Sequence, residues 1–478
     1  MPAVFWMNEE KRKDFFALYS LFFEGEWKKI RDGYEQAAFE RYKDLPLTKE
    51  TSRLLYGTVL ENSVSRLETF ASCAYKHFLQ YGLSLQKRQE YEFEKTDLGT
   101  IYHSVLETFS HSLEETGQTW FTFDSEFARE KLHEIIEKKA AEYSESVLHS
   151  TGRNAYQITR MERVLLRTIS ALQKQLQKGT FVPKEYEAPF RQIMKLDGGE
   201  AEAAGTDEER GSAEPAGMGG EQGSAESAGM DGEQDGFEKQ YMKVSGRIDR
   251  IDTDEDADNI YVKVLDYKSG ENDIDLVSLY QGLQLQLAVY MNAAMEKEGK
   301  RAKGEGKKVI PAAMLYYHVE DPLLESKEDL TEEEADAGIL KKLCVKGLVN
   351  DSTDVVNRLD QSFEGPSDVI PVAKKKDGGY YAYSSVMSQG DMETISAFVS
   401  KKMISIGREI LDGRISLDPY EKGDRSACGY CPYAKICGFD RSLPGCKVRK
   451  IEEYSDKDIL ELMRGIEKNE DLDGNGEE

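Results

Sequence analysis

The chain has 478 residues and a formal net charge of -26. This charge argues against a protein that coats nucleic acid without specificity, because such proteins are usually basic. Two segments hold much of the excess acid: residues 196–240 contain 13 Asp and Glu against 2 Lys and Arg, and residues 451–478 contain 11 against 3. The remaining chain has a net charge of -7, which leaves room for a locally basic surface.

Six cysteines in a chain of this length exclude a secreted disulfide scaffold. No stretch of 18 apolar residues predicts a membrane span, and the first residues lack the basic and apolar regions of a signal peptide. We therefore expect a cytoplasmic protein that has no membrane partner, in a reducing compartment where free thiols persist.

The spacing of apolar residues predicts helical and strand segments in alternation. Helices are expected at 9–82 (in several pieces), 97–115, 126–178, 275–297, 324–345 and 391–412. Strands are expected at 241–251 and 260–268, joined as a hairpin, and at 308–319. Residues 211–222 are repeated in tandem at 223–234 without core-forming side chains, which predicts disorder. This order predicts an α/β core wrapped by helices.

The predicted hairpin carries two carboxylates and a lysine. Strand side chains alternate between faces, so Asp266 and Lys268 share one face, and Asp249 on the preceding arm can lie opposite them. Carboxylates are ligands that Mg²⁺ prefers, and a nearby lysine can offset the negative charge of a phosphoryl transition state. Taken alone, an Asp-x-Lys strand is more often a solvated face with a weak ion pair.

Residues on two predicted helices add to this set. Gln286 and Tyr290 are four residues apart, so they share a helical face. His103 lies on an earlier predicted helix, where a lone histidine is usually a packed or surface residue. A histidine that precedes the carboxylates and the Gln-x3-Tyr pair in this order is a better candidate for a metal ligand.

Three cysteines, Cys428, Cys431 and Cys437, lie within ten residues near the C-terminal end. Their spacing suits a zinc site or an iron–sulfur cluster, and each needs a fourth ligand. No histidine follows them, so Cys73 or Cys446 must supply it. The apolar, helical context of Cys73 alone favours a buried free thiol. The spacing does not separate iron from zinc.

Six motifs in this order resemble one nuclease family: Ser63–Cys73, Leu98–His103, Gly246–Asp252, Asp266–Gly270, Gln286–Tyr290 and the clustered cysteines. They are similar to the C-terminal nuclease region of AddB, a subunit of the bacterial AddAB helicase–nuclease. RecB-type nucleases and CRISPR-associated iron–sulfur exonucleases share the order. The resemblance covers roughly residues 50–450.

The resemblance implies a PD-(D/E)xK fold, like that of restriction endonucleases, closed by a metal cluster that joins distant segments. It implies a [4Fe–4S] cluster on Cys73, Cys428, Cys431 and Cys437. His103, Asp249 and Asp266 would bind Mg²⁺, Lys268 would be the catalytic lysine, and Gln286 and Tyr290 would complete the active site. The expected activity is a DNA exonuclease that degrades the 5′-ended strand at double-strand breaks during recombinational repair, with AddA as partner.

The resemblance also suggests a domain organisation. Residues 1–60 would be a helical remnant of a helicase-like region, 61–450 the nuclease domain with an acidic disordered insertion at 196–240, and 451–478 an acidic tail. No Gly-x4-Gly-Lys-Ser/Thr motif occurs, so ATPase and helicase activity are not supported. Two alternatives stay open: a non-catalytic subunit that binds DNA ends, and a free-standing nuclease of the CRISPR-associated type.

Overall fold

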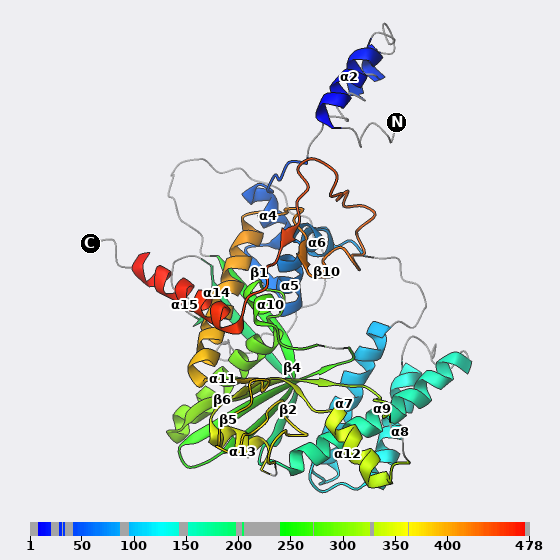
Figure 1. Cartoon of the computed structure of the whole chain (residues 1–478), viewed down its shortest axis with the longest axis vertical. Coiled ribbons are helices and arrows are strands. Elements are labelled where there is room, and N and C mark those ends of the chain that lie inside the picture. Colours follow the sequence, from blue (N-terminus) through cyan, green and yellow to red (C-terminus); the bar gives the residue numbers. More distant parts are fainter. Residues whose placement is uncertain are drawn as a thin grey trace, which may run out of the picture.

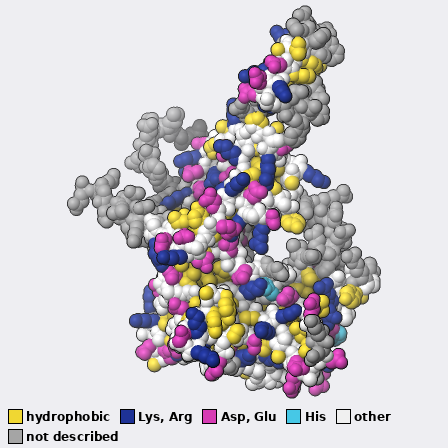
Figure 2. Space-filling model, viewed as in Figure 1, with side chains coloured by type: hydrophobic (Ala, Val, Ile, Leu, Met, Phe, Trp, Pro, Cys, Tyr) yellow, Lys and Arg dark blue, Asp and Glu magenta, His cyan; other side chains and the backbone are white. Residues whose placement is uncertain are grey.

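A computed structural model describes residues 8–20, 28–30, 32–33, 42–86, 95–142, 152–196, 203–204, 240–270, 272–325, 329–361 and 363–473. The tandem repeat and nearly all of the predicted acidic insertion lie outside these ranges. Among the described helices, none combines the length and the apolar character that a membrane span requires. On the face shown in Figure 2, basic and acidic side chains are interspersed.

A mixed sheet of eight strands forms the centre of the molecule (Figure 1). Its order is β3-β2-β4-β5-β6-β7-β8, and β1 pairs with the first part of β4. The strands are β1 (Val59–Asn62), β2 (Val182–Lys195), β3 (Ala203–Ala204), β4 (Tyr241–Glu255), β5 (Asn259–Lys268), β6 (Lys308–His318), β7 (Lys346–Asn350) and β8 (Val386–Met387). The predicted hairpin is confirmed as β4 and β5, and the predicted strand at 308–319 as β6, which runs parallel to β5.

Helices cover both faces of the sheet and enclose two apolar cores. One face packs against α5 (Val64–Ser72), α10 (Leu276–Tyr280), α11 (Gln286–Glu305), α14 (Gln389–Leu411) and α15 (Asp456–Asp473). The other packs against α7 (Lys95–Glu115), α8 (Ser125–Glu142), α9 (Gly152–Gln177), α12 (Glu332–Lys342) and α13 (Thr353–Leu359). The predicted α/β core wrapped by helices is thereby confirmed.

Shorter elements complete the described chain. They are α2 (Glu9–Ser20), α4 (Lys49–Tyr56), α6 (Ala74–His77), a π-helical turn (Phe78–Gly82), and a small sheet of β9 (Tyr420–Lys422), β10 (Arg425–Ser426) and β11 (Arg449–Lys450). The predicted domain boundary at residue 60 falls within β1, and the division into regions stays a prediction.

Three of the predicted elements differ from the structure. The helix expected at 275–297 is interrupted between α10 and α11, where Gly282 has a φ of 81° that a continuing helix cannot accommodate. The helical segment 9–82 contains the strand β1, and the helix expected at 324–345 is confined to α12. In addition, β2 was not predicted, although it is one of the longest strands.

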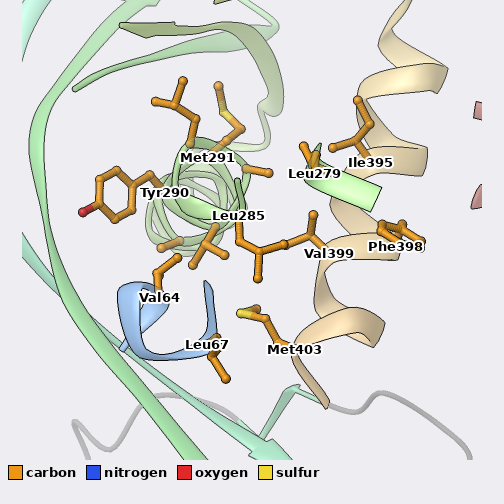
Figure 3. Packing of buried hydrophobic residues seen from close by; sticks show 14 of the residues in the cluster. Val64, Leu67, Leu279, Leu285, Tyr290, Met291, Ile395, Phe398, Val399 and Met403 are labelled. Atoms are coloured by element: carbon orange, nitrogen blue, oxygen red, sulfur yellow. The ribbon is translucent and has the colours of Figure 1, made fainter. Parts of the chain in front are cut away.

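The core on the α11 side is the packing of three helices, shown in Figure 3. Leu67 from α5, Leu285 at the start of α11 and Met403 from α14 are fully buried there. Burying a large apolar side chain contributes roughly 1.5–3 kcal/mol, so this junction is a major source of stability. Tyr290 leaves α11 on the side away from α14 (Figure 3). The same core therefore holds the helix that ends at Cys73 and the helix that begins at Gln286.

Candidate active site

A change of strand partner opens a gap beside β4. Residues 241–244 of β4 pair with β1, and residues 250–255 pair with β5. Between these two stretches β4 has only β2 as a neighbour. Asp249 lies at the end of this gap, and its Oδ2 accepts a hydrogen bond of 2.7 Å from the backbone N–H of Tyr267 in β5. The gap thus admits a carboxylate between two strands of the sheet.

Asp266 and Lys268 lie on β5 beside this carboxylate, on the face covered by α11. The ammonium of Lys268 lies 2.5 Å from Asp266 Oδ2. The Gln286 amide joins both groups, because its oxygen accepts from Lys268 at 2.8 Å and its nitrogen donates to Asp266 Oδ1 at 2.8 Å. The same nitrogen donates to the Tyr290 hydroxyl at 2.9 Å. One amide therefore fixes three functional side chains.

The electrostatics of Asp266 favour a bound cation. Its side chain is fully buried, and burial, followed by the charge of Asp249, raises its pKa to about 7, although Lys268 opposes the shift. Asp249 is also buried, with 7% of its surface exposed. Two carboxylates in such surroundings repel one another, and a divalent cation between them would relieve the repulsion.

His103 on α7 and Glu187 on β2 complete a compact group of possible ligands around Asp249. The Nδ1 atom of His103 lies 3.1 Å from Asp249 Oδ2 and 3.7 Å from Glu187 Oε1. Burial alone would lower the pKa of His103, but its hydrogen bonds to both carboxylates outweigh burial and raise the pKa to about 10. One donor atom from each of the three residues lies within 4.8 Å of the others. This donor set, one imidazole and two carboxylates, suits a divalent cation.

Glu187 was not predicted as a site residue. It lies opposite Asp249 in the β2–β4 ladder, between the pairs Tyr186–Arg250 and Ala188–Ile248. Its φ is 46°, and among the described residues only Ser84 is a second non-glycine with positive φ. Such a conformation costs energy and commonly marks functional positions. The sequence holds no signal for it, because Glu187 is one of many glutamates in a strand that the pattern did not reveal.

A third acid of the hairpin, Asp252, has a different role. It is fully buried on the opposite face of the sheet, where the Arg250 guanidinium donates to both of its oxygens at 2.6 and 2.9 Å. The ammonium of Lys263 lies 2.7 Å from it. These partners satisfy the carboxylate, so Asp252 stabilises the fold and does not belong to the candidate metal site.

The four predicted cluster cysteines line one cavity of about 480 Å³. Cys73 lies at the junction of α5 and α6, whereas Cys428, Cys431 and Cys437 follow the small sheet. The other walls are mostly apolar and include Leu79, Leu417, Tyr433 and Phe439. Cys446, the alternative fourth ligand, does not line this cavity. Four thiols around an apolar cavity fit a metal cluster in the donor atoms that they offer.

The spacing of these thiols bears on which metal they suit. In the described part of the chain, the only group of at least three His, Cys, Asp and Glu donor atoms within 4.8 Å of one another is that of His103, Glu187 and Asp249. A single zinc ion with Zn–S bonds of ~2.3 Å would hold its sulfur ligands about 3.8 Å apart. The cysteine sulfurs are spread more widely, as a cluster of several metal atoms requires.

Glu68 connects the two centres. It lies on α5, five residues before Cys73, and its Oε1 accepts hydrogen bonds from the backbone N–H groups of Leu285 at 2.7 Å and Gln286 at 3.2 Å. A carboxylate at this position satisfies free N–H groups at the start of α11 and interacts favourably with the helix dipole. Glu68 therefore holds Gln286 at a fixed distance from the helix that carries Cys73.

Comparison with known families agrees with this geometry. The sequence model of the PD-(D/E)XK nuclease superfamily matches residues 61–438, which is more than three quarters of the chain. The chain belongs to the PD-(D/E)XK nuclease superfamily. The matched residues include both the carboxylate group and all four cysteines of the cavity, so the PD-(D/E)xK fold expected from the motifs is confirmed.

Several curated relatives are named as the AddB-type subunit of an ATP-dependent helicase/deoxyribonuclease. The protein from Lachnoclostridium phytofermentans is 35% identical over 439 residues, which cover 90% of this chain and 34% of that protein. Those from Clostridium tetani and Bacillus mycoides are each 32% identical, over 92% of this chain and 35% of their own length. The predicted resemblance to AddB is thereby confirmed. The chain spans about a third of the length of these relatives.

The structure brings every predicted site residue of this nuclease into one of two groups. His103, Asp249, Asp266, Lys268, Gln286 and Tyr290 surround the gap beside β4, and the four cysteines surround the cavity. Gln284, which the pattern placed on the same helix, instead precedes α11 and bonds to the backbone of Asp273 and Asp275.

Proposed function

We propose that this chain is a Mg²⁺-dependent DNA exonuclease. The observation that carries the proposal is the convergence of Asp249, Asp266 and Lys268, linked by Gln286, at the gap beside β4. A subunit that only bound DNA ends would not need a buried carboxylate pair with a lysine held against it. Membership of a nuclease superfamily supports the same activity.

The residues of the site suit phosphodiester hydrolysis. When bound by His103, Glu187, Asp249 and Asp266, Mg²⁺ would supply Lewis-acid stabilisation and lower the pKa of an attacking water. Lys268 contributes a fixed positive charge where negative charge accumulates on the phosphoryl oxygens. Gln286 keeps the ammonium of Lys268 beside Asp266, and the Tyr290 hydroxyl holds the Gln286 amide.

We also propose a [4Fe–4S] cluster on Cys73, Cys428, Cys431 and Cys437. The cavity that they share and the wide spacing of their sulfur atoms support it over a single zinc ion. The cluster would join segments more than 350 residues apart and add its binding free energy to folding. Anaerobic purification followed by iron and sulfide analysis tests this proposal. Zinc in place of iron would overturn it.

The names of the relatives support a helicase–nuclease context. We propose that the chain acts on DNA ends together with an AddA-type subunit and degrades the 5′-ended strand during recombinational repair. Oligonucleotides labelled at either end would reveal the polarity of degradation. Co-purification with a helicase subunit would distinguish this complex from a free-standing nuclease.

The central test is cleavage of labelled single- and double-stranded DNA across a Mg²⁺ titration. We expect the wild-type chain to cut, and Asp266→Ala to cut at least about 1000-fold more slowly, since loss of electrostatic stabilisation in an active site costs several kcal/mol. Asp258→Ala, in the exposed β4–β5 turn, is the matched control and should cut normally. Normal activity in Asp266→Ala would refute the assignment.

A further inference from the structure

The strands β2 and β4 continue beyond the candidate active site as a two-stranded ribbon. Its ladder pairs Ala188 with Ile248, Pro189 with Arg247, and Arg191 with Ser245. Glu187 and Asp249 occupy the next position in the same ladder. Because positions two residues apart on a strand share a face, Glu187, Pro189 and Arg191 lie on one face of β2, about 7 Å from one to the next.

Burial identifies the two faces of this ribbon. Ala188, Met194, Met242, Val244 and Ile248 belong to the apolar core, and Phe190 packs against it. The opposite face is exposed at Pro189, Arg191, Ser245 and Arg247. Gly246 makes the inner packing possible, since a Cβ atom there would lie 2.8 Å from the Phe190 ring. The orientation of both arginines is therefore set by a packed inner face.

Neither arginine is neutralised by an acidic neighbour. Within the described ranges, no carboxylate oxygen lies within the 4.0 Å of an ion pair from Arg191 or Arg247. Lys243, further along β4, is by contrast paired with Glu61 at 2.9 Å. Two unpaired guanidinium groups are notable in a chain of net charge -26. They leave a local positive charge next to the carboxylate group.

The ribbon also borders a hollow of about 1560 Å³. Arg191 and Arg247 line this hollow together with Lys297 and Lys300 of α11, and one carboxylate, that of Glu296, is among the lining residues. Lys297 and Lys300 have acidic partners, Glu185 and Glu296, whereas the two arginines do not. The lining is thus predominantly cationic, and the unpaired part of that charge belongs to the ribbon.

We propose that the exposed face of this ribbon binds the phosphate backbone of a single DNA strand and leads it to the carboxylate group. Arginine is suited to this task, since its planar guanidinium matches a phosphate with two parallel hydrogen bonds. A positively charged track is the common feature of proteins that hold single strands without regard to sequence. The proposal rests on the proposed function and adds the path by which substrate reaches the site.

The experiment measures binding without cleavage. All proteins carry Asp266→Ala, and the probe is a fluorescent single-stranded oligothymidylate of 20 nucleotides, followed by anisotropy over a range of salt concentrations. We expect Arg191→Ala/Arg247→Ala to bind about tenfold more weakly at low salt. The slope of log K against log salt should fall by about 1.4, which is the loss of two phosphate contacts on a single strand.

Two further variants serve as controls. Arg53→Ala/Arg129→Ala removes two exposed arginines from α4 and α8 with the same change of charge, and should bind as the parent does. Arg191→Lys/Arg247→Lys keeps both charges and should retain most of the salt slope. Thermal unfolding of each protein verifies that the fold is intact.

The outcomes separate this proposal from the proposed function. If wild type cuts DNA but the ribbon variant binds with the affinity and salt slope of its parent, the strand path is wrong and the nuclease assignment stands. The same conclusion follows if the control arginines matter equally. If the wild-type chain neither binds nor cuts DNA, both proposals fall.

Discussion

The two candidate metal centres of this chain are built in different ways. The carboxylate centre lies inside the sheet, where Asp249 and Asp266 are almost fully buried and already fixed by hydrogen bonds to Tyr267 and Gln286. The cysteine cavity draws Cys73 from a helix junction and its other three thiols from the segment after the small sheet. Of those four thiols, only Cys73 is buried.

This difference separates what each centre depends on. The sheet holds the carboxylates in place through its own ladder and core, so the removal of one ligand should abolish activity and spare the fold. The cysteine segment has few buried apolar side chains, so whatever joins it to Cys73 should contribute to folding itself. Variants at the two centres should therefore divide cleanly into losses of activity and losses of stability.

Cys431→Ser should have the largest effect on stability. We expect loss of the visible absorbance of the cluster and a fall in the free energy of unfolding of about 5 kcal/mol or more, because metal binding and folding are coupled. Cys446→Ser makes the same chemical change outside the cavity and should leave both unaltered. If Cys431→Ser is as stable as Cys446→Ser in thermal unfolding, the two centres do not differ as described.

Substitution of Glu68 should affect the connection between the centres. Glu68→Ala leaves the N–H groups of Leu285 and Gln286 without their acceptor, and we expect cleavage to slow about tenfold as Gln286 loses its position, which corresponds to about 1.4 kcal/mol. Glu68→Gln keeps one acceptor oxygen and should restore most of the rate.

The readout for Glu68 is kcat and KM together with cluster absorbance. A fall in kcat with normal absorbance is expected, because Gln286 acts on the reacting groups and not on the cysteines. Unchanged kcat in Glu68→Ala would show that the contact has no influence on the active site.

A smaller effect concerns His77, which is buried on α6 near the cysteine cavity between Tyr56, Phe70 and Tyr81. Burial, aided by the charge of Arg66, lowers its pKa to about 4. The unfolded chain therefore binds the proton more readily between pH 6.5 and 4. Stability should rise with pH across this window and be lost as the pH falls through it, by on the order of 1–3 kcal/mol.

His77→Phe keeps an aromatic ring at this position and removes the titration. Chemical unfolding at pH 7 and at pH 4.5 should then show a smaller difference than in the wild-type chain. An equal pH dependence in both proteins would assign the effect to other groups.

Much of the candidate site could be predicted from the sequence because its signals are local. Asp266 and Lys268 are two residues apart on one strand, and Gln286 and Tyr290 are one helical turn apart, so short patterns reveal them. The three clustered cysteines are likewise visible from their spacing. The sheet's hairpin and most of the long helices followed from apolar periodicity for the same reason.

What the sequence could not reveal depends on contacts between distant segments. Glu187 reaches the site through a positive φ in β2, a strand that lacks a clear alternating pattern. The break between α10 and α11 depends on Gly282, which approaches Ala71 and Ile406 closely. The satisfied role of Asp252 depends on Arg250 and Lys263 across the sheet. None of these contacts can be read from local sequence.

The account's central claim is that the gap beside β4 binds a divalent cation. The most direct measurement is a titration with Mn²⁺, followed by electron paramagnetic resonance, of the wild-type chain, Asp249→Asn and the control Glu185→Gln. We predict that Asp249→Asn loses at least about tenfold in affinity while its unfolding curve is unchanged, and that the control binds as the wild type does. Equal Mn²⁺ binding in all three proteins would contradict the claim.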